Sequence, residues 1–237
     1  MEFTLLWAAL SGAVGLYGAL WWMGRRDTSL CVRDLWEIAI TAAVVGLAVG
    51  RVVAMVRGGV NPFSHPGDLI LVRAGVDTAA ASIAALATAG WLTRSDPFEQ
   101  LDGLTPAAIL GVAGWHAGCL FRDACLGTPS SLPWAWSQPG SSITRHPVEL
   151  YAALLLAIGA WALFRLRLRY PSPGLVSGLG LALTGLARLI TEPLRPSLFA
   201  GPVWWYAAAV AAGVALAAWS LYRTGSGDTE SAPPPLQ

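Results

Sequence analysis

The chain has 237 residues, of which 55% are hydrophobic and only 12% charged, and its formal net charge is +1. Soluble domains carry about 25% charged residues, so this composition indicates a membrane protein. The small net charge gives no sign of nucleic-acid binding, and we expect none. All of the basic residues are arginines. This has two open explanations: a GC-rich genome, or a need for cations that bind phosphate through two parallel hydrogen bonds.

The hydrophobic segments predict an all-α, polytopic membrane protein. A membrane-spanning helix needs about 20 mostly apolar residues. We expect seven such helices at residues 4–23, 36–56, 69–93, 104–121, 148–166, 174–194 and 203–222. No basic residue precedes the first run, which is also long for a cleaved signal peptide. The predicted organisation is one transmembrane domain over residues 1–223, followed by a disordered cytoplasmic tail over residues 224–237.

The distribution of arginines predicts the orientation. If the N-terminus lies outside, the inner loops and helix edges hold Arg25, Arg26, Arg33, Arg94, Arg165, Arg167, Arg169 and Arg223. The outer loops then hold Arg57, Arg122, Arg145 and Arg195. Because inner loops of membrane proteins carry the excess of basic residues, we expect the N-terminus outside and the C-terminus in the cytoplasm.

Ionisable residues inside the apolar segments are the main functional signal. In the expected orientation they all fall at the outer ends of helices: Arg51, Arg73, Asp77, His116, His146, Glu149, Arg188 and Glu192. A charge at the bilayer centre costs about 2.5–3.5 kcal/mol on insertion scales, so such groups face the protein interior. Their excess of arginine suits an anionic ligand such as a lipid phosphate. The alternative is that Arg73 with Asp77, and Arg188 with Glu192, form purely structural pairs four residues apart.

Small residues and cysteines add weaker signals. Glycines at the spacing of close helix contacts recur as Gly46 and Gly50, as Gly174 and Gly178, and as Gly12, Gly15 and Gly18. Cys119 and Cys125 flank a short outer segment where a disulfide can form, and a reactive thiol stays open as the alternative. Cys31 falls in an inner loop. No spacing of ligands matches a metal site, and we expect neither a metal nor a cofactor.

Three motifs resemble one enzyme family. They read GCLFRDACLGTPSSLPWAW from Gly118, RHPVELYAALL from Arg145, and GLARLITEPLR from Gly185. With Tyr17-Gly18 and Gly50-Arg51 they resemble the prolipoprotein diacylglyceryl transferase family. That family has a turn G-[RK]-P-T-D-L-P-W-A, then R-H-P-[ST]-Q-L-Y-E-A, then Y-G-x-x-R-F-x-x-E. The order and spacing agree over roughly residues 10–200.

The resemblance implies a reaction and its partners. Enzymes of the family transfer the diacylglyceryl group of phosphatidylglycerol to the lipobox cysteine of a prolipoprotein signal peptide, forming a thioether and releasing glycerol phosphate. They work in the bacterial inner membrane as multi-pass proteins. The reaction needs cations that hold the phosphate and a base that helps to make the thiolate.

Several positions depart from the family pattern. Arg73 stands where the family has the histidine of a His-Gly-Gly motif, and His116 stands where it has an arginine. Glu149 replaces the glutamine of the His-Pro motif, and Thr184 replaces a tyrosine. Two interpretations follow. Either His116 is a relocated base, or the chain has lost the transfer chemistry and binds an anionic phospholipid or lipoprotein segment in the same cavity.

The residues fall into two expected roles. His116 would take the thiol proton, with His146 or Asp77 behind it, because histidine changes its charge near neutral pH. The expected catalytic residues are His116, Arg188, Glu192 and His146, with Glu192 orienting Arg188. The expected substrate-binding residues are Tyr17, Arg51, Arg73, Asp77, Gly127, Arg145 and Glu149. The simpler alternatives are that His116 only joins helices and that His146 only caps one.

Overall fold

The computed structural model describes residues 4–64, 76–119, 125–195 and 203–230, and it is all-helical apart from one short hairpin. The α-helices are α1 (Thr4–Gly24), α2 (Val32–Arg57), α4 (Thr78–Leu92), α5 (Pro97–Gly118), α6 (Val148–Arg169), α7 (Leu175–Thr191) and α8 (Val203–Glu230). A 3-10 turn, η3 (Glu192–Leu194), follows α7, and β1 (Trp136–Ser137) pairs antiparallel with β2 (Thr144–Arg145).

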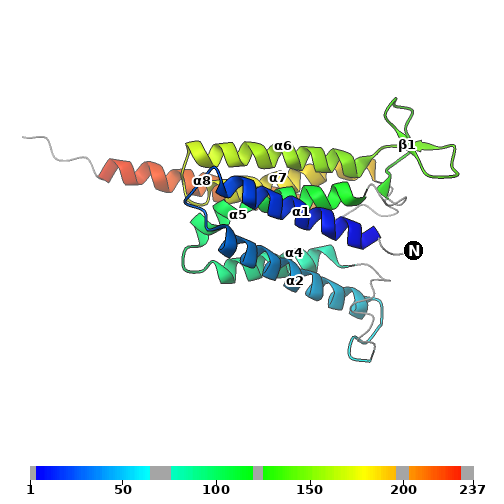
Figure 1. The fold of residues 1–237 in the computed structure, drawn as a ribbon, viewed down its shortest axis with the longest axis horizontal. Helices are drawn as coiled ribbons and strands as arrows, with labels where there is room; N and C mark the ends of the chain where they lie inside the picture. Colours follow the sequence, from blue (N-terminus) through cyan, green and yellow to red (C-terminus); the bar gives the residue numbers. More distant parts are fainter. Residues whose placement is uncertain (1–3, 65–75, 120–124, 196–202, 231–237) are drawn as a thin grey trace, which may run out of the picture.

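The helices lie side by side along one direction and form a bundle (Figure 1). The main contacts join α1 to α5, α2 to α4, α5 to α6, and α7 to α8. The start of α1 and the β1–β2 hairpin lie at the same end of the bundle, which we call the hairpin end (Figure 1). The C-terminal part of α8 extends from the opposite end, which we call the tail end. Residues far apart in sequence therefore meet at the hairpin end.

Glycine allows the closest helix contacts. A Cβ atom at Gly46 would come within 2.7 Å of the carbonyl oxygen of Ala81, and Gly50 is as tightly packed against α4. A Cβ atom at Gly178 would lie 2.6 Å from the backbone nitrogen of Ala217 on α8. The backbones of α2 and α4, and of α7 and α8, can approach only because these side chains are absent. The packing role expected for these three glycines is confirmed.

The other glycines expected to pack behave in three ways. Gly12 and Gly15 lie against α5, where a Cβ atom would come within 3.2 Å and 2.8 Å of backbone oxygens. At Gly18 a Cβ atom would meet no described atom within 4 Å. Gly174 precedes α7 with φ of +92°, a left-handed conformation that favours glycine. Gly174 therefore shapes the turn that enters α7.

The protein crosses a membrane several times. Among the described residues, four segments are long and apolar enough to span a bilayer: Val32–Arg57, Val148–Arg169, Leu175–Leu194 and Val203–Thr224. α4 is apolar but shorter, with 15 residues. Large apolar side chains cover the outside of the bundle, and Trp91, Ile158 and Trp204 are each more than half exposed. Such a surface is typical of a protein whose solvent is lipid.

The tail end carries a set of tryptophan–arginine pairs. In each pair an exposed guanidinium lies over an indole ring, 3.8 to 5.6 Å from its centroid. The pairs are Trp21 with Arg25, Trp22 with Arg26, Trp91 with Arg94, Trp161 with Arg165, and Trp219 with Arg223. Amphipathic rings and cations of this kind gather where a membrane meets water.

The start of the segment predicted at residues 69–93 needs correction. The helix expected over residues 69–93 begins at Thr78, and Asp77 lies before it as the N-cap, accepting a hydrogen bond from Ala80 N at 2.9 Å. Asp77 is therefore not in the helix that was expected to pair it with Arg73, which lies outside the described residues. A carboxylate that satisfies a free helix N–H is a common reason for a helix to start.

At the other end of the chain, α8 continues to Glu230, whereas the sequence predicts its end at residue 222. Residues 224–230, expected to open a disordered tail, are helical here. Between the start of α8 and Pro233 the sequence contains no proline that would end the helix. Residues 231–237 lie outside the described part of the chain.

Candidate active site

His116 occupies the last turn of α5 at the hairpin end, and it is only 8% exposed. The helix is held closely against α1 by Gly118, because a Cβ atom there would lie 2.6 Å from Cα of Ala8. Nδ1 of His116 contacts the carboxylate oxygen Oε2 of Glu149. His116 therefore joins α5 to the beginning of α6.

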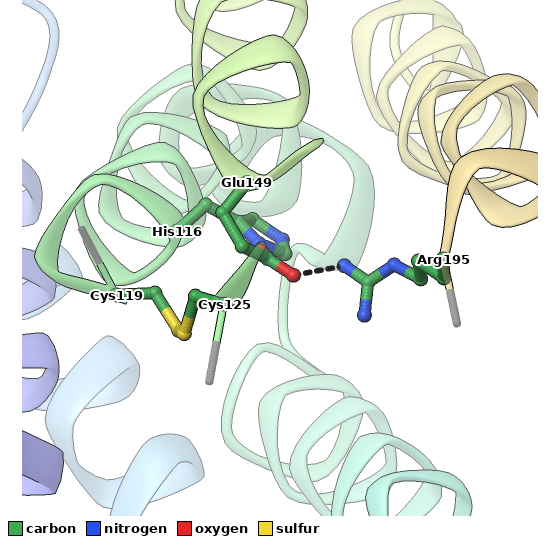
Figure 2. Close-up of a disulfide and its surroundings, with 5 residues drawn as sticks. All are labelled: His116, Cys119, Cys125, Glu149 and Arg195. Atoms are coloured by element: carbon green, nitrogen blue, oxygen red, sulfur yellow. Dashed lines mark hydrogen bonds and ion pairs between the residues drawn. A yellow bond between two sulfur atoms is a disulfide. The ribbon is translucent and has the colours of Figure 1, made fainter. Parts of the chain in front are cut away.

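Glu149 is the centre of the group. It lies in the first turn of α6, directly after the Pro147–Val148 start of the helix, and is 8% exposed. Its second oxygen, Oε1, accepts a hydrogen bond from Nη2 of Arg195 at 2.5 Å (Figure 2). A carboxylate in a first helical turn is also favoured by the helix dipole. Both oxygens of Glu149 thus have cationic or ionisable partners.

Arg195 reaches Glu149 because of the way α7 ends. Pro193 cannot donate a backbone hydrogen bond, so the helix tightens into the turn η3. This turn places Nε of Arg195 3.9 Å from Oε2 of Glu192, three residues earlier. Both of these atoms are buried, and neither has a hydrogen-bond partner within the described residues.

Arg188 adds a second cation to the group. It lies one turn before the end of α7, donates a hydrogen bond to the hydroxyl of Tyr206 at 3.3 Å, and lies 5.4 Å from the centroid of that ring. Its charge acts on both Glu149 and Arg195. Two guanidinium groups held near each other repel, and an anion between them would relieve that repulsion. The pair of arginines is therefore suited to binding a phosphate.

The loop between α5 and α6 is tied to the end of α7. Gly127 N donates to His146 O at 2.7 Å, and Thr128 N donates to Leu194 O at 2.8 Å. A Cβ atom at Gly127 would collide with that same carbonyl of Leu194 and with Val148. Arg145 donates to the carbonyl oxygen of Gly127 at 3.2 Å. Gly127 and Arg145 thus hold the loop next to Leu194, the residue that precedes Arg195.

His146 belongs to a separate aromatic group. Its Nδ1 lies 3.4 Å from the hydroxyl of Tyr151, which accepts a hydrogen bond from Nε1 of Trp134 at 2.9 Å. The N-cap of α6 is Pro147, so His146 does not cap the helix through its side chain. The expectation that His146 or Asp77 stands behind His116 is wrong, because Glu149 occupies that position.

Cys119 and Cys125 form a disulfide, one of the two alternatives that the sequence left open. Their Cα atoms lie 5.9 Å apart, and Figure 2 shows the bridge beside His116 at the end of α5. Cys31, before α2, is a free and exposed thiol. Within the described residues, no group of three or more His, Cys, Asp or Glu side chains is placed to hold a metal ion.

Comparison with known proteins identifies the family of the chain. The family model described as prolipoprotein diacylglyceryl transferase matches residues 1–219. The chain belongs to the prolipoprotein diacylglyceryl transferase family.

Individual relatives agree with the family match. A protein from Methylibium petroleiphilum is 34% identical over 84% of this chain and 80% of its own length. One from Polaromonas naphthalenivorans is 28% identical over 84% and 78%, and one from Thermosynechococcus vestitus is 26% identical over 93% and 88%. Each of these relatives is named phosphatidylglycerol–prolipoprotein diacylglyceryl transferase.

The expected site residues of this diacylglyceryl transferase family member fall into three sets. The structure brings His116, Glu149, Arg188 and Glu192 together. Gly127, Arg145 and His146 build the adjoining loop. In the third set, Tyr17 packs edge-on against Trp36 and Asp77 pairs with Arg57. Arg51 is buried in α2, with 3% of its surface exposed.

Sequence reasoning missed two residues of the group. Arg195 was counted only as a charge of an outer loop, although its place two residues after Pro193 and three after Glu192 is a usable signal. Tyr206, at the start of α8, carries no signal of its own. Glu192 contacts Arg195, and the expectation that Glu192 orients Arg188 stays a prediction.

Proposed function

We propose that this protein transfers the diacylglyceryl group of phosphatidylglycerol to the lipobox cysteine of a prolipoprotein signal peptide. One observation carries the proposal beyond family membership. A buried histidine with a carboxylate partner lies next to two arginines at one end of the bundle. The histidine supplies a proton acceptor, and the arginines supply binding for a phosphate.

The chemistry assigns one task to each group. His116 takes the proton of the substrate thiol, because the thiolate is the nucleophile. The sulfur attacks the diacylglyceryl carbon that carries the phosphate oxygen, so a carbon–sulfur bond forms while a carbon–oxygen bond breaks. Glycerol phosphate leaves with the electron pair. Arg188 and Arg195 hold the phosphate as it departs, which stabilises the charge that develops there.

The other expected residues complete the proposed substrate path. Arg51 and Arg73 contribute further positive charge for the lipid phosphate. Gly127 and Arg145 keep the loop of the hairpin end closed against α7, beside Arg195. Glu192 stays in the proposed site through its contact with Arg195, whereas Tyr17, Asp77 and His146 are proposed to act only along the path by which the substrates reach it.

The orientation belongs to the same proposal: seven spans in a bacterial plasma membrane, with the N-terminus outside and the C-terminus in the cytoplasm. The disulfide at the hairpin end supports this, because disulfides persist in oxidising compartments outside the cytoplasm. The tryptophan–arginine pairs at the tail end fit the excess of basic residues on the cytoplasmic side. The active site then opens toward the outer leaflet, where secreted precursors emerge.

The test is direct. Purified protein is reconstituted with phosphatidylglycerol and a synthetic lipobox peptide, and the peptide is weighed by mass spectrometry. We expect the peptide to gain one diacylglyceryl group. Arg188→Ala should lower the rate by about 10²–10³-fold, as loss of a positioned charge donor does elsewhere. The control is Arg33→Ala, which removes an exposed arginine paired with Glu37 on α2 and should leave the rate unchanged.

Two results would contradict the proposal. The first is no adduct under conditions in which an authentic transferase modifies the peptide; lipid bound without turnover would then identify a non-catalytic relative. The second is full activity of Arg188→Ala, which would remove the central phosphate ligand. His116→Gln tests the base in the same assay, since undiminished transfer in that variant would exclude His116 from proton transfer.

A further inference from the structure

We propose that Glu149 is a positioning residue that makes Nε2 of His116 the proton acceptor of the reaction. This inference rests on the proposed function and assigns Glu149 a different part from the substrate-binding one that the sequence suggested. It starts from one contact, between Nδ1 of His116 and Oε2 of Glu149, in which both side chains are about nine-tenths buried.

The contact selects one form of the imidazole. A neutral histidine carries a proton on one ring nitrogen and a lone pair on the other, whereas an ionised carboxylate can only accept hydrogen bonds. Nδ1 of His116 must therefore carry the proton and donate it to Glu149. The lone pair is left on Nε2, which becomes the nitrogen able to take a proton from a thiol. When Nε2 is protonated, the imidazolium lies beside a negative charge that stabilises it.

The surroundings keep Glu149 ionised. Oε1 accepts from the guanidinium of Arg195, which is charged at every accessible pH. The charge of Arg188 also acts on Glu149, and the nearby Glu192 is itself 3.9 Å from Arg195. From α8, Tyr206 faces the same arginines. With one oxygen on His116 and the other on Arg195, Glu149 is engaged on both sides and acts through His116 rather than on the substrate.

The sequence pattern supports a joint role for the two residues. In the resemblance to the family motifs, His116 takes the place of an arginine and Glu149 takes the place of a glutamine. The structure puts these two departures in direct contact, although they are 33 positions apart. An arginine cannot give up its proton and so cannot serve as a base, whereas a histidine held by a carboxylate can. The two exchanges together therefore place an oriented base at the end of α5.

The first experiment examines the tautomer without turnover. The chain has three histidines, so ¹⁵N-histidine labelling of the reconstituted protein gives a simple NMR spectrum, assigned with His65→Gln and His146→Gln. At a pH at which the ring is neutral, we expect His116 to be protonated on Nδ1. Protonation on Nε2 would overturn the inference. Because no substrate is needed, this outcome is independent of whether the transferase activity itself is found.

The second experiment separates a positioning role from substrate binding. Glu149→Leu should lower kcat by about 100-fold, the scale of general-base catalysis, with the KM for phosphatidylglycerol nearly unchanged. Glu149→Gln should retain more activity, because its amide oxygen can still accept the Nδ1 proton. Glu37→Leu, an exposed glutamate on α2, is the control and should behave like the native protein. A raised KM with kcat preserved in Glu149→Leu would show instead that Glu149 binds substrate.

Discussion

Asp102 and Glu149 are both buried acidic residues, but their partners give them different roles. Asp102 on α5 accepts hydrogen bonds from the backbone nitrogens of Gly174 and Ser177 at 2.8 and 2.7 Å. It thereby caps the first turn of α7 from a neighbouring helix. Within the described residues, Glu149 is hydrogen-bonded to two ionisable side chains, those of His116 and Arg195. A buried carboxylate indicates a reactive site when its partners can change charge, and a structural role when they are backbone amides.

Asp27 gives a prediction about acid stability. It ties the loop between α1 and α2 to Arg167 on α6 at 3.3 Å and accepts two hydrogen bonds from Ser29. Burial alone would raise the pKa of Asp27, but the hydrogen bonds from Ser29 and the charge of Arg167 outweigh it and hold that pKa below its usual value. The stabilisation is therefore complete above the unfolded-state pKa, about 3.9, and is lost as the pH falls through the folded-state value.

The measurement compares native protein with Asp27→Asn by thermal unfolding between neutral and strongly acidic pH. The variant should be less stable at neutral pH, and the two Tm curves should converge below about pH 4, where Asp27 becomes protonated. A constant difference in Tm across the whole range would show that Asp27 does not provide pH-dependent stability.

For single residues, the sequence predicts the position along the membrane normal better than it predicts which side chains are in contact. The apolar runs show that His116, Glu149 and Arg188 lie near the same ends of their helices. They do not show that Glu149 faces His116, since this depends on how α5 and α6 are rotated against each other. The position of Arg195 depends on the 3-10 turn η3, which contains Pro193 and does not follow the periodicity of an α-helix.

Among the elements, the contact between α7 and α8 depends most on missing side chains. A Cβ atom at Gly178 would lie 2.6 Å from Ala217 N, and one at Gly213 would collide with Ala182 N. Gly178→Ala and Gly213→Ala should therefore each lower the free energy of unfolding by about 1–3 kcal/mol, the usual cost of overpacking. Because α8 carries Tyr206, a partner of Arg188, these variants should also lower transfer activity.

The control for these variants is Gly90→Ala on α4, where an added Cβ atom would meet no described atom within 4 Å. Denaturant titration of the three proteins in the same detergent measures the difference. Equal stability of all three would contradict the close contact of α7 with α8.

The hydrophobic runs predict where the helices lie, but they predict the first and last residues of the helices less well. α5 begins at Pro97, before the residue 104 expected, because its first turns contain polar residues that an apolar search excludes. Pro97 at the first helical position favours a helix start that hydropathy does not detect. α4 ends within one residue of its expected end, and α6 starts where expected.

At the scale of the whole molecule, the two ends of the bundle differ in chemistry, and Cys31 can report which faces the cytoplasm. This free, exposed thiol is the N-cap of α2 at the tail end. In the proposed orientation a membrane-impermeant maleimide should label it in inverted vesicles and not in right-side-out ones. A Ser64→Cys substitution in a Cys31→Ser background, in the exposed loop after α2, should give the reverse pattern. Labelling of Cys31 in right-side-out vesicles would show that the protein has the opposite orientation in the membrane.

The contact between His116 and Glu149 also bears on how the chain enters the bilayer. These residues lie at the ends of α5 and α6, which a loop connects, so both are synthesised well before Arg195. A hydrogen bond between a histidine and a glutamate lowers the cost of bringing either polar group into lipid. The two helices can therefore insert as one hairpin, before α7 exists. On this view the same contact first assists assembly and later serves catalysis.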